Sequence, residues 1–239
     1  MRPVDLCDEI YRELTREIVS MQLLPGQTIS ENGLCERFGV SRTPMRSVLQ
    51  RLSHNRLVEI VPHKHTIITL IDYDILRQII YERVAVECMV FRDFVLNHTQ
   101  EQLDQARHAM EEMRKLALMQ RVAPQKFNPN RFFSLDRSMH KLWFQATGNP
   151  YLFESFESDL ANYNRFCMMD IQAGRNTADV MEEHESMLRL VETGDISQVE
   201  PLLKRHFYGG LRRLESHIFD DLAPYFSNLP QAEETPDQE

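Results

Sequence analysis

The sequence predicts a mainly α-helical protein, in which an N-terminal winged helix-turn-helix domain precedes an all-helical antiparallel bundle. Three observations lead to this prediction. The chain of 239 residues has only 8 glycines, below the usual share of ~7%, so tight turns are few. Near the N-terminus, three short helical patterns precede two β-branched runs. From residue 72 onward, apolar residues recur only at the spacing of helices.

The overall composition excludes several classes of protein. Hydrophobic residues make up 42% and charged residues 26% of the chain, which excludes wholesale disorder, collagen and fibrous repeats. No apolar run reaches the ~18 residues that span a membrane, and the N-terminus is acidic where a signal peptide needs an apolar stretch. We expect a cytoplasmic protein without a membrane partner. Its cysteines are far apart and should be reduced thiols: Cys7, Cys35, Cys88 and Cys167.

Charge is distributed unevenly along the chain. The net charge of −9 argues at first sight against a nucleic-acid partner. Residues 1–71, however, hold nine Lys and Arg against eight Asp and Glu, whereas residues 72–239 hold 18 against 28. Between Arg37 and Lys64 there are six basic residues and only one acidic residue, Glu59. The N-terminal segment therefore has a basic patch on an otherwise acidic protein.

The N-terminal elements follow from residue spacing and from turn residues. Helical spacing before Pro25-Gly26 predicts a first helix, with the apolar residues Cys7, Ile10, Leu14, Ile18 and Met21. A second helix over 31–38 stops at Gly39, which suits a left-handed cap. Ser41 then caps a third helix, whose apolar face is Met45, Val48, Leu49 and Leu52. Two strands, at 57–61 and 66–70, flank a charged tip.

The outer face of the third helix suits DNA recognition. It presents the polar side chains of Arg42, Thr43, Arg46 and Gln50. The planar fork of an arginine donates two parallel hydrogen bonds to guanine, and the Ser41 hydroxyl with the first-turn N–H groups suits a phosphate. The alternative is an amphipathic helix with a solvated basic face, and spacing alone leaves both interpretations open.

A longer motif in this segment resembles a known family. Leu24-Pro25-Gly26, Ile29-Ser30-Glu31 and the run from Phe38 to Leu52, with its G-V-S-R-T-P-x-R core, are similar to the N-terminal domain of the GntR family of bacterial transcription regulators. The resemblance implies that Arg42, Thr43 and Arg46 contact an operator. It also implies that the hairpin tip, with His63, Lys64 and His65, reaches the minor groove. Members usually have a glycine near this tip, where the chain has His65.

The remainder of the chain predicts an antiparallel helical bundle. We expect helices at 73–96, 100–121, 130–147, 151–171, 178–193 and 196–221, separated by Pro and Gly residues and without strands. The polar, acidic residues at the end predict a disordered tail. The predicted domains are therefore 1–71 for DNA binding, 72–226 for effector binding and dimerisation, and 227–239 for the tail.

Metal-binding side chains interrupt the apolar faces of three predicted helices. Asp136 and His140 are one turn apart and suit a shared ion. His184 and His206 lie within the apolar stripes of the last two helices. Three imidazoles and a carboxylate suit Zn, Ni, Co or Mn, with positions left for a ligand. The alternative is a set of hydrogen-bonded core histidines, which is the commoner role of a single histidine on such a face.

This half of the chain also resembles a known domain. Asp136-x-x-x-His140, the run from Thr147 to Leu152, Glu183-His184, Gly194-Asp195 and His206-Phe207 are similar to the FCD ligand-binding domain of FadR-type GntR regulators. The resemblance implies that Asp136, His140, His184 and His206 hold a divalent cation. It further implies an all-helical domain that responds to small organic acids, whose carboxylate completes the metal shell.

A charged pair interrupts another apolar face. Arg83 and Glu87 lie on the helical row of Leu76, Ile80 and Phe91 and match the family's R-x-x-x-E pattern. Arg83 is either an effector contact beside the metal or half of a structural ion pair.

The sequence therefore favours a ligand-responsive transcription regulator, which we expect to be a repressor. A single short recognition helix makes few base contacts, so we expect a homodimer on a palindromic operator. A metal-dependent hydrolase-type enzyme is one alternative, although the chain has no G-x-S-x-G, P-loop or G-x-G-x-x-G motif. A metal sensor, in which the cation itself is the signal, is the other.

Overall fold

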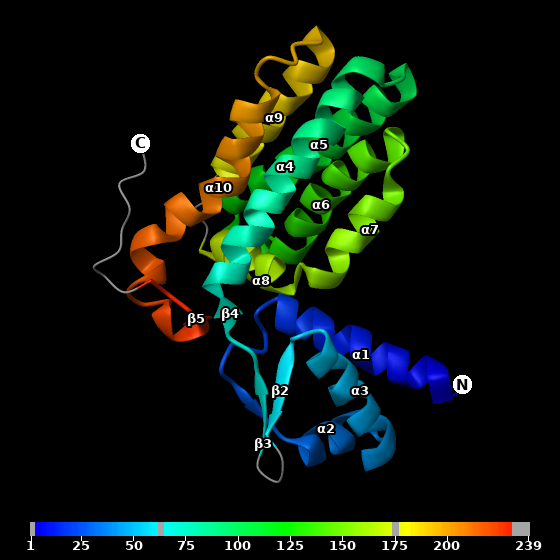
Figure 1. Cartoon of the computed structure of the whole chain (residues 1–239), viewed down its shortest axis with the longest axis vertical. Coiled ribbons are helices and arrows are strands. Elements are labelled where there is room, and N and C mark those ends of the chain that lie inside the picture. The colour runs from blue at the N-terminus through cyan, green and yellow to red at the C-terminus, as the bar shows by residue number, and fades with distance from the viewer. Residues whose placement is uncertain (1–2, 62–64, 174–176, 231–239) are drawn as a thin grey trace. The chain divides into compact units, whose positions relative to one another are not determined.

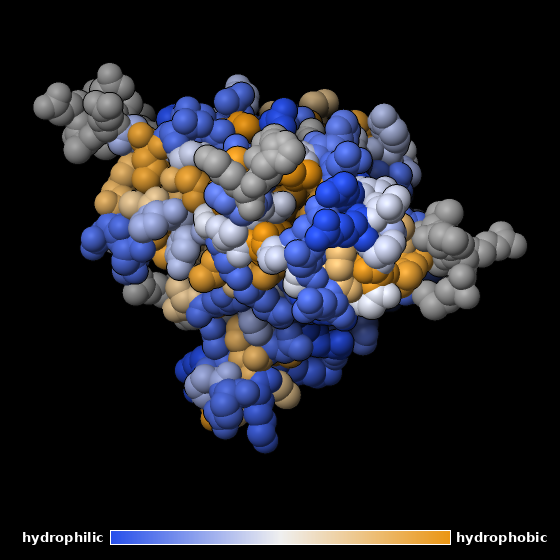
Figure 2. All heavy atoms as spheres, turned by 90° about the horizontal axis from the view of Figure 1, so that it is seen from below, coloured by the Kyte–Doolittle hydropathy of each residue, from blue (hydrophilic) through white to orange (hydrophobic). Residues whose placement is uncertain are grey.

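The computed structural model describes residues 3–61, 65–173 and 177–230 (Figure 1). The chain forms two compact units. The N-terminal unit comprises the residues up to Arg77 together with those from Ser216 onward, and the helical unit comprises Gln78–Glu215. On the face shown in Figure 2, hydrophilic residues are interspersed with smaller hydrophobic areas.

The helices of the N-terminal unit pack through the predicted apolar residues. α1 (Pro3–Val19) contacts α3 (Arg42–His54), and α2 (Glu31–Phe38) also packs on α3. The apolar side chains of α1 and α3 are buried because their helical spacing directs them to the same side, as for Ile10, Leu14, Ile18, Met45, Val48, Leu49 and Leu52. The predicted helix-turn-helix is confirmed.

The turn between α2 and α3 relies on Gly39. Its backbone is left-handed, with φ 63° and ψ 35°, a conformation that costs a glycine little because it has no Cβ. Ser41 occupies the N-cap position of α3, as predicted, but its side chain makes no capping hydrogen bond. The Ser41 residue is exposed, so its hydroxyl remains accessible to a partner at the helix N-terminus.

A three-stranded antiparallel sheet follows α3. Its order is β1 (Thr28–Ile29), β3 (His65–Ile68) and β2 (Val58–Val61), with Val58 opposite Ile68. The predicted hairpin is present, but β1 was not predicted because a two-residue strand leaves no alternation in the sequence. Residues 62–64 at the hairpin tip, including His63 and Lys64, lie outside the described residues.

The C-terminal segment returns to the N-terminal unit. β4 (Ile71–Asp72) pairs in parallel with β5 (Phe226–Ser227), after the short helix η2 (Ala223–Tyr225). The expectation that no strand follows residue 72 was wrong, because this pairing joins distant residues. The compact units also divide the chain differently from the predicted 72–226 domain. Most of the predicted tail, residues 231–239, lies outside the described residues.

The remaining elements are helical, as predicted. They are α4 (Tyr73–Asn97), α5 (Gln100–Val122), η1 (Pro124–Lys126), α6 (Pro129–Ala146), α7 (Pro150–Asp159), α8 (Ala161–Gln172), α9 (Thr177–Thr193) and α10 (Val199–Ile218). α5 packs on α6 and α9, and α6 also packs on α8. Among the residues that the structure describes, no helix is long and apolar enough to cross a membrane.

The predicted helix over 151–171 is interrupted. Leu160, with φ −74° and ψ 4°, separates α7 from α8. No glycine or proline marks this position, so the sequence alone predicts one continuous helix. Leu160 is buried, and both α7 and α8 contact α6. Tertiary packing therefore overrides the local helical preference here.

Candidate functional site

The four predicted metal ligands converge inside the helical unit. Asp136 and His140 come from α6, His184 from α9 and His206 from α10. Each offers a ligand atom, and all four ligand atoms lie within 4.8 Å of one another. The ring centroid of His184 lies 4.9 Å from that of His206 and 5.6 Å from that of His140. Helix packing therefore assembles one candidate cation site from residues that are 70 positions apart in the sequence.

Burial makes this cluster chemically unusual. The exposed fractions of His140, His184 and His206 are 1%, 0% and 8%. Among the described residues, the Nε2 atoms of His140 and His184 are buried without a hydrogen-bond partner, although Nε2 of His184 lies 3.4 Å from Oδ1 of Asp136. An unpaired buried nitrogen is energetically costly, and a bound cation would accept its lone pair. The donor set therefore fits a divalent metal.

Two glutamates orient the imidazoles. Nδ1 of His140 donates a hydrogen bond to Oε2 of Glu87, at 2.5 Å, and Nδ1 of His206 donates to Oε2 of Glu183, at 2.9 Å. A carboxylate can only accept, so each contact places the proton on Nδ1 and leaves the Nε2 lone pair for a metal. Glu183 was not predicted in this role. The sequence feature that could have revealed it is an acidic residue directly before His184. In the structure, Glu183 is only 5% exposed.

The electrostatics favour the protonation states that bind a cation. Burial alone would raise the pKa of Asp136. The three imidazoles, His184 first, lower it by more than burial raises it, so the pKa lies below its usual value. Burial lowers the pKa of His184 to about 3. Burial also opposes ionisation of Glu87, yet Arg83 and His140 lower its pKa to about 2. Near neutral pH the carboxylates are charged and His184 is a neutral ligand.

Arg83 forms a buried ion pair with Glu87, which is one of the two roles that the sequence allowed for it. Its Nη2 atom lies 2.6 Å from Oε1 of Glu87, and its guanidinium stacks on the rings of Tyr163 and Phe207. Because Glu87 also binds His140, Arg83 acts on the cluster through that glutamate. Its predicted contact with an effector stays a prediction.

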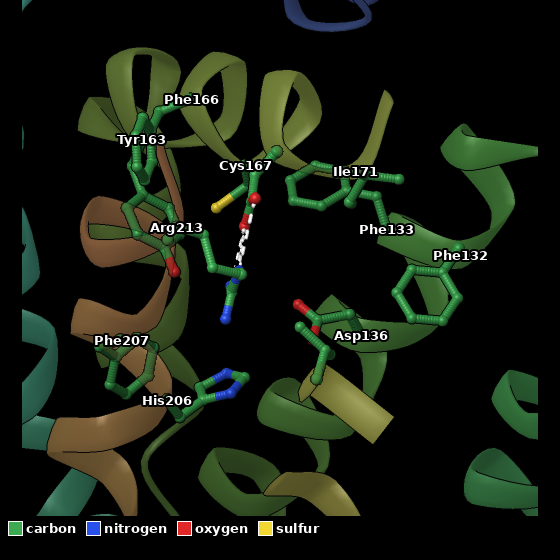
Figure 3. Close-up of a pocket in the computed structure, with 13 residues that line it drawn as sticks. Phe132, Phe133, Asp136, Tyr163, Phe166, Cys167, Ile171, His206, Phe207 and Arg213 are labelled. Atoms are coloured by element: carbon green, nitrogen blue, oxygen red, sulfur yellow. Dashed lines mark hydrogen bonds and ion pairs between the residues drawn. The ribbon is translucent and has the colours of Figure 1, made fainter. Parts of the chain in front are cut away.

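A cavity adjoins the cluster. It is small, with about 40 Å³ of space for the centres of water-sized molecules. Figure 3 shows Asp136, His206 and Arg213 directed toward one another across this space. Its described lining residues are Phe132, Phe133, Asp136, Tyr163, Phe166, Cys167, Asp170, Ile171, Val180, His206, Phe207, Gly210 and Arg213. The arginine among them is Arg213, which sequence reasoning missed, and not Arg83.

The predicted DNA-reading residues lie on the outer face of α3. Ser41 and the helical residues Arg42, Thr43, Arg46 and Gln50 are all exposed. His65 is exposed at the start of β3. Nε of Arg46 lies 3.2 Å from Oε1 of Glu31 on α2, so this guanidinium is oriented without being buried. The exposed side chains thus form a continuous polar face at the beginning of α3.

Comparison with known families identifies both parts of the chain. Residues 6–68 match the bacterial regulatory proteins of the gntR family, and residues 78–209, more than half of the chain, match the FCD domain. The chain belongs to the GntR family, with an FCD domain. As a GntR/FCD protein it is a DNA-binding transcription regulator.

Individual relatives of this GntR/FCD regulator cover most of its length. It is 27% identical over 198 residues to the HTH-type transcriptional repressor RspR of Escherichia coli (strain K12), covering 83% of this chain and 84% of RspR. The solved structure of E. coli McbR/YncC has a TM-score of 0.68 at 20% identity, covering 89% of this chain and 98% of that one. A putative GntR regulator from Rhodococcus sp. RHA1 also has a TM-score of 0.68, at 16% identity, covering 88% and 97%. These two structures support the fold.

Proposed function

We propose that this GntR/FCD regulator is a homodimeric repressor whose operator affinity changes when a small organic acid binds beside a divalent metal in the helical unit. The observation that carries the proposal is the convergence of Asp136, His140, His184 and His206, with two buried Nε2 atoms that lack partners. The cavity lined by Asp136 and His206 adjoins this cluster, so a bound acid would contact the same site.

The four residues would hold the cation through imidazole nitrogens and one carboxylate. That donor set suits Zn, Ni, Co or Mn. The metal, when bound, would supply a positive charge that attracts a carboxylate oxygen. Glu87 and Glu183 would keep His140 and His206 in the metal-binding tautomer.

DNA recognition is assigned to the start of α3. Arg42, Thr43 and Arg46 would contact bases and phosphates, with Ser41 and Gln50 at the flanks of this surface. His65, and with it His63 and Lys64, would contact the minor groove from the hairpin. Because the target is DNA, we place the protein in the cytoplasm.

An apolar stripe on α4 supports a homodimer. Tyr81 and Met89 are each 71% exposed, and Leu96 is 53% exposed. These residues recur at helical spacing along one side of α4, together with the exposed Ala85, and Arg92 lies between Met89 and Leu96 on the same side. An exposed apolar stripe of this kind suits an interface. Two copies related by a two-fold axis would read a palindromic operator. The name of RspR supports the assignment as a repressor.

The same geometry supports a regulator and not an enzyme. A metal with an open position can activate water, but hydrolysis also needs a nearby general base. The two glutamates that surround the cluster already accept hydrogen bonds from its imidazoles. Both matched families are regulators.

Operator binding tests the proposal directly. The full chain is stripped with a chelator, reloaded with Zn²⁺ or Mn²⁺, and titrated by fluorescence anisotropy against DNA from upstream of its own gene. A panel of small carboxylic acids is then added, and His184→Ala is the site control. We expect salt-dependent binding and a change of affinity only when metal and acid are both present. A change with metal alone identifies a metal sensor, and turnover of an acid identifies an enzyme.

A further inference from the structure

Arg213 lies between two hollows of the helical unit. It lines the cavity beside the metal cluster and also an open groove with Asp179, Glu182, Glu183, Arg205, Gly209 and Arg212. Its side chain is 15% exposed. Arg213 therefore separates the inner cavity from the groove, where an entering molecule would meet it.

Arg213 is held in place by two aspartates. Its Nη2 and Nε atoms lie 2.8 and 3.1 Å from Oδ2 of Asp170 on α8. Its Nη1 atom lies 3.6 Å from Oδ2 of Asp179 on α9. Asp170 is 2% exposed, so the ion pair presents a fixed donor beside a fixed acceptor at the cavity wall.

Two glycines in α10 make room for this arrangement. A Cβ at Gly209 would lie 2.8 Å from Nη1 of Arg213, and a Cβ at Gly210 would lie 2.8 Å from the Phe166 ring. Neither glycine has a positive φ, so backbone conformation does not require them. Glycine is unfavourable inside a helix, and here the absent side chains leave the space that Arg213 and the cavity occupy.

We propose that Arg213, paired with Asp170, determines which effector binds, and that it selects a monocarboxylate that also carries hydroxyl groups. This inference rests on the proposed function, because it assumes that the metal cluster receives the carboxylate. It adds the residue that recognises the remainder of the molecule, and the chemical class of that remainder.

The charge of the cavity favours one carboxylate. Among its described lining residues, Asp136 and Asp170 are acidic and Arg213 is basic, which gives a formal sum of −1. A divalent cation in the cluster changes this sum to +1, which a single carboxylate neutralises. A second carboxylate would leave an uncompensated negative charge in a largely buried space, which is unfavourable.

The Arg213–Asp170 pair matches hydroxyl groups. A hydroxyl group both donates and accepts a hydrogen bond. The N–H of Nε and one N–H of Nη2 bind Asp170, so the remaining guanidinium N–H groups are donors beside a carboxylate acceptor. The aromatic wall, which includes Phe132, Phe166 and Phe207, would cover the carbon skeleton. The cavity is therefore complementary to a short hydroxylated acid, with its carboxylate at the cluster and a hydroxyl at Arg213.

A series of three-carbon acids tests this assignment. Propionate has no second polar group, glycerate has hydroxyls and malonate has a second carboxylate. Binding to the metal-loaded full chain is followed by fluorescence of Trp143, the single tryptophan, whose ring centroid lies 4.6 Å from that of His140. We expect glycerate to bind at least about tenfold more tightly than propionate, and malonate to bind more weakly than glycerate.

Variants separate the contact with Arg213 from chelation of the metal. Arg213→Met should lower the ratio of glycerate affinity to propionate affinity about tenfold, while metal content and propionate affinity are retained. Arg213→Lys keeps a positive charge beside Asp170 but loses the planar guanidinium fork. If the Met variant fails to fold, the Lys variant measures the contribution of the fork instead. Asp170→Asn should shift the preference toward malonate, because it makes the cavity more positive. Arg212→Met is the control, since Arg212 lines only the groove.

The outcomes distinguish this inference from the proposed function. An unchanged glycerate-to-propionate ratio in both Arg213 variants would overturn it, and so would tighter binding of malonate than glycerate to the wild-type protein. Failure of all three acids to bind the metal-loaded wild type would also overturn it. Absence of stoichiometric metal or of operator binding in the wild type would instead refute the proposed function.

Discussion

Nδ1 of His206 donates a hydrogen bond to Oε2 of Glu183, across 2.9 Å between α10 and α9. The next residue in the sequence, His184, contributes its own imidazole to the same cluster. α9 therefore supplies both a candidate ligand and the group that orients another ligand. Arg83, Glu87 and His140 form a comparable chain on the other side.

Glu183→Gln should weaken metal binding about 10–100-fold, because the imidazole of His206 loses its orienting carboxylate. Isothermal titration with Zn²⁺ against a chelator competitor measures the loss. The adjacent Glu182 is exposed, so Glu182→Gln is the matched control and should bind metal normally. Equal affinities for the two variants would contradict the orienting role of Glu183.

Metal loading should be visible at Trp143. We expect Co²⁺ or Ni²⁺ to quench its fluorescence with one-to-one stoichiometry, because its ring lies 4.6 Å from that of His140. Metal at ~100 times its Kd should stabilise the fold by about 2.7 kcal/mol, which thermal melts detect. His184→Ala should abolish both effects.

His108 provides the control for this experiment, since it is exposed on α5 outside the cluster. His108→Ala should retain the quenching and the stabilisation. If it loses them together with His184→Ala, the metal is bound elsewhere on the surface.

Arg46→Ala should abolish specific operator binding while metal content is unchanged. Removing a guanidinium that reads a guanine costs about 1–3 kcal/mol, and loss of a phosphate contact lowers the salt slope by about 1. Anisotropy titrations at several salt concentrations measure both quantities.

Arg51→Ala is the comparison on the same helix. Arg51 pairs with Asp8 at 2.6 Å and stacks on Tyr11, so it faces α1. This variant should retain operator binding. Retained binding by Arg46→Ala would refute the assignment of the outer face of α3.

The two glycines of α10 should respond differently to alanine. Gly210→Ala would push against the Phe166 ring, and overpacking of this kind destabilises by about 1–3 kcal/mol. Gly209→Ala meets only the end of the Arg213 side chain, which can move. A gain in helix propensity of up to ~1 kcal/mol should offset that movement.

Urea unfolding measures the two stabilities, and the acid series measures the effect on binding. Gly209→Ala should be nearly neutral for folding yet reduce the preference for glycerate, since it displaces Arg213. A Gly209→Ala protein with normal acid selectivity would show that the position of Arg213 is unimportant.

Met89→Glu should weaken the homodimer. It places a charge in the centre of the exposed apolar stripe of α4, and burying an unpaired charge in an interface is costly. Analytical ultracentrifugation should show a shift toward monomer, together with weaker operator binding. Val122→Glu changes another apolar residue, at the end of α5 and 70% exposed, and should leave the dimer intact. A dimer unaffected by Met89→Glu would locate the interface elsewhere.

Much of this site follows from local sequence pattern. Asp136 and His140 share one helical face because they are four residues apart, and Gly39 ends α2 because the turn is left-handed. Short elements were harder to predict. β1 and β5 have two residues each, and the break at Leu160 has no local breaker. In these cases the partners of the segment, and not its own residues, decide its conformation.

The sequence by itself determined the order of the domains, the helix-turn-helix and the identity of the four candidate ligands, because each depends on spacing within one helix or on a contiguous motif. Only the tertiary structure decided how these parts combine. It joined Glu87 to His140, paired Glu183 with His206 and brought Arg213 to Asp170, 43 positions away. Helical periodicity shows which side of a helix is buried, but it does not show which helix lies opposite, and the chemistry of the cavity depends on that second fact.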